Sequence, residues 1–216
     1  MDPYYRVHVP TTSGNRLVVV VQTGVASVKA AIAVTRILSY FHRPELAILV
    51  GITAGLKNEG LNLGDVIVPT ATVDVESGKK TPKGKEPAGS KLEMDARAHA
   101  AVSTWAGLSQ WQSAWKTAIS GRPTLPLLHT DCKLACTASV IAFEKEAKSY
   151  KALDRKVRGI EMEAVGIAQA CLQVAPLLVI KAISDWADSE KDDRWHSYCM
   201  QVAADLAYRL ISDETI

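Results

Sequence analysis

The stretch Arg158–Asp188, RGIEMEAVGIAQACLQVAPLLVIKAISDWAD, decides the fold of this chain and predicts a strand, a helix and a second strand. Pro176 ends the helix, and the run LLVIKAI after it is mostly apolar, as in strands that are buried within a parallel sheet. Between the two strands, apolar residues recur at the spacing of one helix face: Ala164, Ile167, Ala168, Cys171 and Leu172.

Carboxylates follow both strands of this unit. Glu161 and Glu163 come at the end of the first strand, and Asp185 comes at the end of the second. In open α/β sheets, ligands bind outside the carboxyl ends of the strands. The stretch therefore predicts a small-molecule site that contains acidic side chains.

The rest of the chain continues the alternation of strands and helices, which indicates an α/β fold with a largely parallel sheet. The helix from Gly24 to about Tyr40 is expected to bury Val28, Ala31, Ile32 and Leu38, and the helix Asp192–Ile211 is strongly amphipathic. The other expected helices are Asp95–Leu108 and Ala138–Lys148. The other expected strands are Leu17–Gln22, Leu46–Val50, Asp65–Pro69, Thr70–Val75 and Leu127–Thr130.

Two segments are expected to lack regular structure. Residues 1–16 contain Pro3, Pro10 and a TSGN turn signal. Residues 76–91 contain five lysines and two prolines, a composition that cannot pack a core. They predict a solvated loop or mobile flap. The alternative is a lid whose charge meets a phosphorylated ligand.

Composition limits the class of protein. The 216 residues, 48% apolar and 22% charged, are enough for one domain with a sizeable core. The net charge of +2 and the basic segment without interleaved aromatic residues indicate neither a nucleic-acid nor a membrane partner. We expect a cytoplasmic protein without metal or cofactor, because there is no signal peptide and the cysteines form no disulfide or zinc framework: Cys132, Cys136, Cys171 and Cys199.

The segment IEMEA followed by AISDWAD resembles the signature of the nucleoside phosphorylase superfamily. It is most similar to the branch of nucleosidases that act on methylthioadenosine and S-adenosylhomocysteine. VVVVQTGVASVKAAIAV and LVGITAGLKNEGLNLGDVIVP also fit in order, and the match runs from about Leu17 to Leu210. The resemblance implies a three-layer sandwich around a mixed, largely parallel sheet, and a homodimer or higher homo-oligomer.

Cleavage of a ribosyl–purine bond needs an acid that protonates the leaving base. Asp185 is the candidate, because it follows an apolar strand and precedes Trp186, and desolvation favours the protonated carboxyl. The resemblance places this acid opposite N7 of the purine. The alternative is that Asp185 only caps a turn or helix.

The sugar needs an anion, because positive charge develops on it during cleavage. Glu163 is the candidate: its carboxylate can accept hydrogen bonds from O2′ and O3′. The alternative is a glutamate that the helix dipole favours. The resemblance places Met162 against the ribose, where plain core packing is the alternative, and Glu161 beside it. In a strand, Glu161 points away from Met162.

The resemblance places the base near Ile52, Thr53, Ala54, Ser139 and Val140, and it adds Ser184 beside the acid. This chain departs from the family at two places there. It has Ala54-Gly55 in place of paired glycines, and Cys136-Thr137-Ala138 in place of Ser-Gly-Asp. Preference for adenine therefore stays open.

Members of the family begin with one more strand, and a glutamate in the loop after it orients the attacking water. Here Leu17–Gln22 matches the second strand of the family, and MDPYYRVHVPTTSGN contains no glutamate. Residues 1–216 are thus expected to be a single domain without the first strand of the family. Either that strand lies upstream in a longer protein, or the chain is slow or inactive.

We expect a purine nucleosidase-like hydrolase that acts on a purine nucleoside or nucleotide. Phosphorylases of the family hold phosphate with arginines, and GITAGL contains none, although Arg36 and Arg43 are near in sequence. The alternatives are a purine nucleoside phosphorylase and a catalytically silent nucleotide-binding module of a larger protein.

Overall fold

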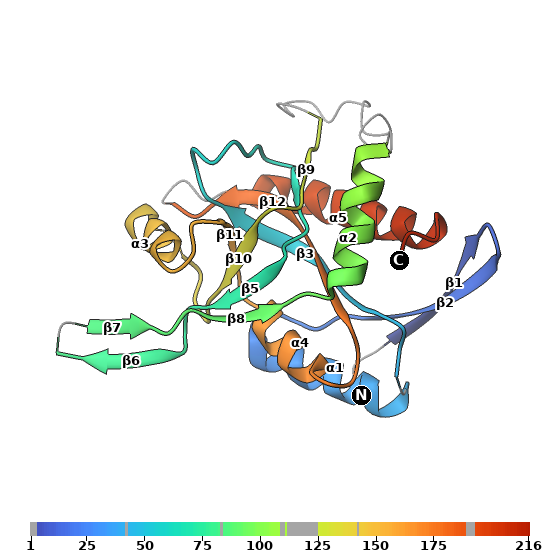
Figure 1. Ribbon diagram of the computed structural model, residues 1–216, viewed down its shortest axis with the longest axis horizontal. Helices are drawn as coiled ribbons and strands as arrows, with labels where there is room; N and C mark the ends of the chain where they lie inside the picture. Colours follow the sequence, from blue (N-terminus) through green and yellow to red (C-terminus); the bar gives the residue numbers. More distant parts are fainter. Residues whose placement is uncertain are drawn as a thin grey trace.

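The computed structural model describes residues 4–41, 43–82, 84–108, 111, 125–141, 143–188 and 193–216. Its centre is an eight-stranded sheet in the order β8-β5-β10-β11-β3-β12-β4-β9 (Figure 1). Four of the seven pairings are parallel, which confirms a mixed sheet in an α/β fold. The strands are β3 (Ala47–Gly55), β4 (Val66–Ile67), β5 (Ala71–Asp74), β8 (Ser90–Glu93), β9 (Leu128–His129), β10 (Lys133–Cys136), β11 (Val157–Glu161) and β12 (Leu177–Trp186).

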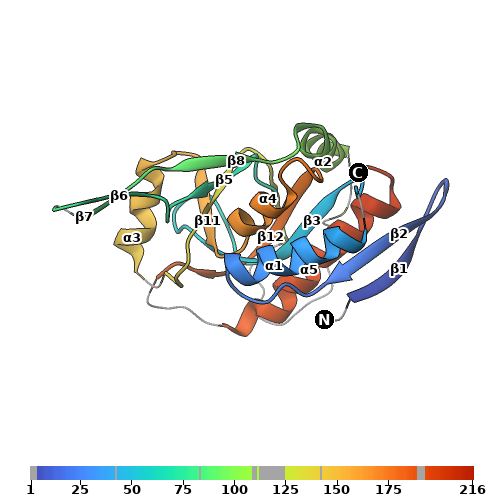
Figure 2. The ribbon, with the colours of Figure 1, turned by 90° about the horizontal axis from the view of Figure 1, so that it is seen from below.

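Helices cover both faces of the sheet and make three layers. On one face, α2 (Ala96–Leu108) and α5 (His196–Ser212) pack in one apolar cluster with β12. On the other face, α1 (Ser27–Tyr40) and α4 (Ala164–Cys171) pack side by side in a second cluster (Figures 1 and 2). None of the described helices is long and apolar enough to cross a membrane.

The buried face of α5 agrees with the helical period in the sequence, whereas the expected face of α1 is wrong at Val28 and Ile32; Leu38 does pack against the core. Val28 is 72% exposed and Ile32 is 49% exposed, and the buried residues of α1 are Ala30 and Ala33. The small side chains of Ala30 and Ala33 allow α1 to approach α4 closely. The described start of α5 also differs, because a short 3-10 turn, η3 (Asp193–Trp195), precedes it and residue 192 lies outside the described residues.

The expectation of an irregular N-terminus is wrong for the described residues from Tyr4 onward. β1 (Tyr4–Thr11) and β2 (Gly14–Val21) form an antiparallel hairpin with Gly14 at the turn. Pro10 is tolerated because β1 has only one pairing edge. The tip of the hairpin lies against the C-terminus, where the Ser13 N–H donates to Glu214 over 3.2 Å.

The segment 76–91 is not a loop. β6 (Gly78–Thr81) and β7 (Gly84–Pro87) form a projecting hairpin, and β8 joins the sheet beside β5 (Figure 1). The Asp74 carboxylate accepts the Glu76 and Ser77 N–H groups and fixes the turn that leads into the hairpin. A two-stranded ribbon with polar side chains needs no core, so composition alone did not reveal it.

The expected helix over residues 138–148 begins only at α3 (Glu144–Ser149), which continues into η2 (Tyr150–Ala152). Before it, the Ser139 N–H donates to Thr137 Oγ1 over 3.3 Å, a local turn that competes with a helix. Residue 142 of this segment lies outside the described residues.

β3 has a free edge although it lies in the middle of the sheet. β11 pairs only with its last two residues, so residues 47–53 have no described ladder partner on the side away from β12. β12 is buried up to Asp185, whereas β3 alternates between buried and half-buried residues. β2 likewise pairs only with β1 in the described part of the chain. Two strand edges are therefore unpaired in this region.

Candidate active site

The end of β11 and the start of α4 carry Glu161 and Glu163. Glu161 is buried, and its carboxylate accepts the N–H groups of Glu163 at 2.9 Å and Ala164 at 2.9 and 3.1 Å. It thereby satisfies backbone donors that a helix leaves open at its N-terminus. The chain needs Glu161 at this position to hold the loop that presents Glu163.

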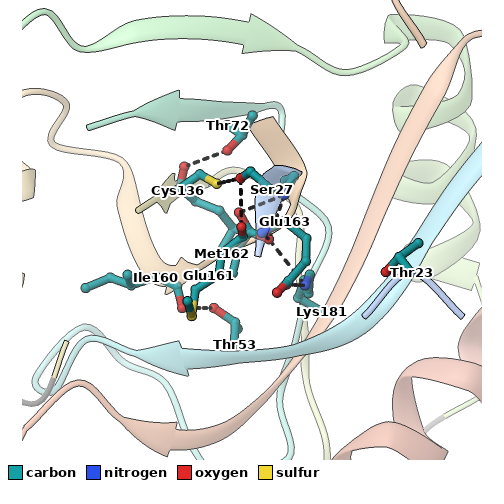
Figure 3. Close-up of polar contacts among 12 residues, drawn as sticks. Thr23, Ser27, Thr53, Thr72, Cys136, Ile160, Glu161, Met162, Glu163 and Lys181 are labelled. Atoms are coloured by element: carbon teal, nitrogen blue, oxygen red, sulfur yellow. Dashed lines mark hydrogen bonds and ion pairs between the residues drawn. The ribbon is translucent and has the colours of Figure 1, made fainter. Parts of the chain in front are cut away.

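A buried lysine, Lys181 of β12, lies between the two carboxylates (Figure 3). Its Nζ is 3.0 Å from Glu163 Oε2 and 3.3 Å from Glu161 Oε2. Burial alone would lower the pKa of Lys181, but the charges of Glu161 and Glu163 outweigh it and raise the pKa above its ordinary value. The ammonium therefore stays charged at neutral pH and neutralises part of the acidic cluster.

Sequence reasoning missed Lys181. The signal in the sequence is a single cation inside the apolar run LLVIKAI. A charge in a buried strand needs a partner of opposite charge, so Lys181 predicts a buried ion pair.

The N-terminus of α1 holds Glu163 from the other side. The Ala26 N–H donates to Glu163 Oε1 over 3.1 Å, and Ser27 Oγ donates to the Met162 carbonyl over 2.7 Å (Figure 3). The Glu163 side chain keeps 16% exposure, so a ligand can reach it. The sequence segments TGVASV and IEMEA thus meet at one place.

This contact depends on Gly166 in α4, where a Cβ would overlap the backbone of Ser27. We expect Gly166→Ala to push α1 away, to cost about 1–3 kcal/mol of stability and to weaken any activity that needs Glu163. Thermal unfolding and an activity assay measure both effects. Gly107→Ala is the control, because a Cβ there meets nothing within 4 Å. Equal effects of the two substitutions would contradict this role of Gly166.

Asp185 lies at the end of β12, next to a β-bulge. Ile183 pairs with Thr53 and Asp185 with Ala54, so Ser184 is the extra residue of β12. Because side chains alternate along a strand, this bulge turns Asp185 to the face of α5, away from Ile183 and Lys181. No contact in the described structure joins Asp185 to Glu163. Glu163 follows β11 and Asp185 lies at the end of β12, and these strands flank β3 in the sheet.

The surroundings of Asp185 do not fit a capping role. It is 6% exposed, it accepts Ser184 Oγ over 2.8 Å at Oδ2, and it accepts no backbone N–H among the described residues. Its Oδ1 is buried without a hydrogen-bond partner in the described structure. A buried carboxyl oxygen without a partner is rare and indicates a missing ligand, water or proton.

The residues expected near the base belong to β3 and to the segment after β10. Thr53 is buried and donates to the Ile160 carbonyl over 2.9 Å. Ile52 packs into the cluster under α5, and Ala54 is the register partner of Asp185. Ser139 and Val140 are exposed and follow β10, whose Cys136 pairs with Glu161.

Glu76 is a second residue that the sequence did not point to. Its Oε1 accepts Thr137 Oγ1 over 2.6 Å and the Ala138 N–H over 3.0 Å. It fixes the backbone just before Ser139 and Val140. In the described residues, no group of His, Cys, Asp and Glu side chains forms a possible metal site.

The sequence profile of the phosphorylase superfamily matches residues 3–213. The chain therefore belongs to this superfamily. Among curated relatives, the ATP nucleosidase Cap17 of Escherichia coli is 29% identical over 82% of the chain and 38% of its own length. A 5'-methylthioadenosine/S-adenosylhomocysteine nucleosidase of Staphylococcus aureus is 28% identical over 88% of the chain and 77% of its own length.

This superfamily member has the fold of solved nucleosidases. The 5'-methylthioadenosine/S-adenosylhomocysteine nucleosidase of Neisseria meningitidis, solved with methylthio-immucillin-A, aligns with a TM-score of 0.72 and 22% identity. The alignment covers 91% of this chain and 81% of that one. The chain spans less than half the length of the first curated relatives that it matches.

Proposed function

We propose that this chain is a purine nucleosidase that hydrolyses the N-glycosidic bond of a purine nucleoside or nucleotide. The observation that carries the proposal is the pair of acidic sites at the ends of β11 and β12. Glu163 is held by a buried cation, and Asp185 is buried with one oxygen unpartnered. The relatives named as nucleosidases support the same reaction class.

Asp185 acts as the general acid. In this role its carboxyl, buried at the end of β12, donates a proton to N7 of the leaving purine. Ser184 Oγ donates to Oδ2 and leaves Oδ1 free to face the base. Protonation neutralises the negative charge that the base acquires as the bond breaks.

Glu163 acts on the sugar. Its carboxylate is partly exposed and oriented by Lys181 and the Ala26 N–H. The remaining lone pairs can accept the O2′ and O3′ hydroxyls. The same negative charge stabilises the oxocarbenium-like sugar in the transition state. Glu161 and Lys181 position Glu163 and need no contact with substrate.

Water is the proposed nucleophile. Among the described residues, no arginine forms an ion pair with Glu161, Glu163 or Asp185, which supports hydrolysis over phosphorolysis. A purine nucleoside phosphorylase remains the second candidate. A silent nucleotide-binding module is the third.

The test is free-base release from methylthioadenosine, S-adenosylhomocysteine, adenosine, inosine, AMP and ATP, each with and without phosphate. We expect release of the base from at least one compound without phosphate. Strict dependence on phosphate would identify a phosphorylase. Thermal stabilisation by a compound that is never cleaved would identify the binding module.

We further propose that residues 1–216 form a single domain and that one more strand covers the free edge of β3 in the active protein. The unpaired edges of β3 and β2 support this. A glutamate after that strand would orient the water, as the family resemblance implies. A longer chain that supplies both, if no more active in the same assay, would contradict this proposal.

The exposed apolar residues of α1, Val28 and Ile32, together with Val25 before it, support a homodimer through this face. Light scattering that gives the mass of one chain would contradict it. The four cysteines are buried and free, which supports a reducing, cytoplasmic location. Detection of a disulfide in the protein from cells would count against that location.

A further inference from the structure

His196 is the first residue of α5, and its ring faces the candidate acid. Nε2 of His196 is 3.6 Å from Asp185 Oδ2 and 3.2 Å from Asp193 Oδ1. Nε2 and Asp185 Oδ1 are both buried polar atoms without a hydrogen bond in the described structure. The distance to Asp185 exceeds that of a hydrogen bond, as is common for catalytic pairs before substrate binds.

The three side chains make a path from solvent to the buried acid. Asp193 is 76% exposed, His196 is one-third exposed, and Asp185 is 5% exposed at the side chain. A cation at the N-terminus of a helix is disfavoured by the helix dipole. Carboxylates from η3 and β12, those of Asp193 and Asp185, lie on the Nε2 side of the ring.

Besides Asp193, whose exposed carboxylate is 3.2 Å from Nε2, two other ionisable groups lie near this strand end among the described residues. Cys199, one turn further along α5, donates to the Ile183 carbonyl over 3.2 Å. Burial raises the pKa of its thiol to about 12, so it stays protonated. Asp188 is 2.5 Å from Lys57 and is neutralised by it.

We infer that His196 is a proton relay that recharges Asp185 between turnovers. The inference rests on the proposed function. After Asp185 has given its proton to the purine, the imidazolium releases the Nε2 proton to the Asp185 carboxylate. One N–H bond breaks and one O–H bond forms, which leaves a neutral imidazole and a neutral carboxyl. The imidazole then takes a proton from solvent. In this role His196 acts through Asp185.

The test is His196→Gln, because an amide keeps a polar group but cannot shuttle a proton. Rapid mixing with excess substrate should show a first turnover at the wild-type rate, because the first turnover does not need the relay. Later turnovers should be about 100-fold slower, and added imidazole should restore them. His129→Gln is the control. His129 also pairs with a buried aspartate, Asp65, at 2.9 Å, but it should show neither a burst nor rescue.

Two outcomes would overturn the relay. One is a His196→Gln enzyme that turns over at the wild-type rate throughout. The other is an equal loss in the first and later turnovers without rescue, which indicates a structural role. His196→Asn gives the same readout if His196→Gln fails to fold. Asp185→Asn distinguishes failure of the proposed function from failure of the relay. Full activity in the Asp185→Asn enzyme would contradict the proposed function itself. An inactive Asp185→Asn enzyme together with a His196→Gln enzyme of wild-type activity would contradict only the relay.

Discussion

Replacing Asp185 by asparagine is expected to abolish base release and to leave the fold intact. An amide cannot deliver the proton that the leaving purine requires, and general acid catalysis contributes about 10²–10⁴-fold to the rate. The amide oxygen can still accept Ser184 Oγ, so the strand end keeps its hydrogen bond. The measurement is kcat for base release, with thermal unfolding to check the fold.

Asp188→Asn is the matched control for this variant. Asp188 lies three residues further on, is also buried, and pairs with Lys57 at 2.5 Å. Its replacement removes a carboxylate of the same strand end without touching the proposed acid, so most activity should remain. An Asp185→Asn enzyme with more activity than the Asp188→Asn enzyme would contradict the assignment.

Replacing Lys181 by methionine is expected to have the largest effect on stability. It leaves Glu161 and Glu163 facing each other in a buried site without a cation, and breaking a buried ion pair costs about 3–5 kcal/mol. For a chain of this size, that lowers Tm by about 10 °C. Activity should fall as well, because Glu163 loses its anchor.

The combined change of Lys181→Met, Glu161→Gln and Glu163→Gln separates charge from packing. It should recover much of the lost stability, because no uncompensated charge stays buried. No recovery would mean that Lys181 contributes by packing alone. Because its folded pKa is raised, the stabilisation by Lys181 is present below the ordinary pKa of 10.5 and is lost as the pH rises through the folded value. Tm differences between wild type and Lys181→Met should therefore be constant around neutral pH.

The elements around Arg158–Asp188 could be predicted because their signals are local. The strand that ends at Glu161, the start of the helix at Ala164 and the apolar strand after Pro176 agree with the sequence pattern. The same holds for the buried face of α5. The helix from Ala164 itself ends earlier than expected, at Cys171, and Leu172 of its expected apolar face is 59% exposed. Each of these elements has a period or a breaker that does not depend on distant residues.

The residues that were missed depend on contacts between distant segments. Lys181 is a charge in an apolar strand until the order β11-β3-β12 brings it beside Glu161 and Glu163. The approach of His196 to Asp185 depends on the bulge at Ser184, which sequence alternation did not reveal. The first part of helix α1 was misjudged because its buried contact uses Ala30 and Ala33, whereas Val28 and Ile32 point outward.

The most direct measurement is the fate of oxygen when the best substrate is cleaved in heavy-oxygen water with phosphate present. Mass spectrometry of the sugar product reads the atom bonded to C1′. The proposed mechanism predicts heavy oxygen at C1′ in the wild-type product and no product from Asp185→Asn. A sugar 1-phosphate without the heavy label would contradict hydrolysis and identify phosphate as the nucleophile.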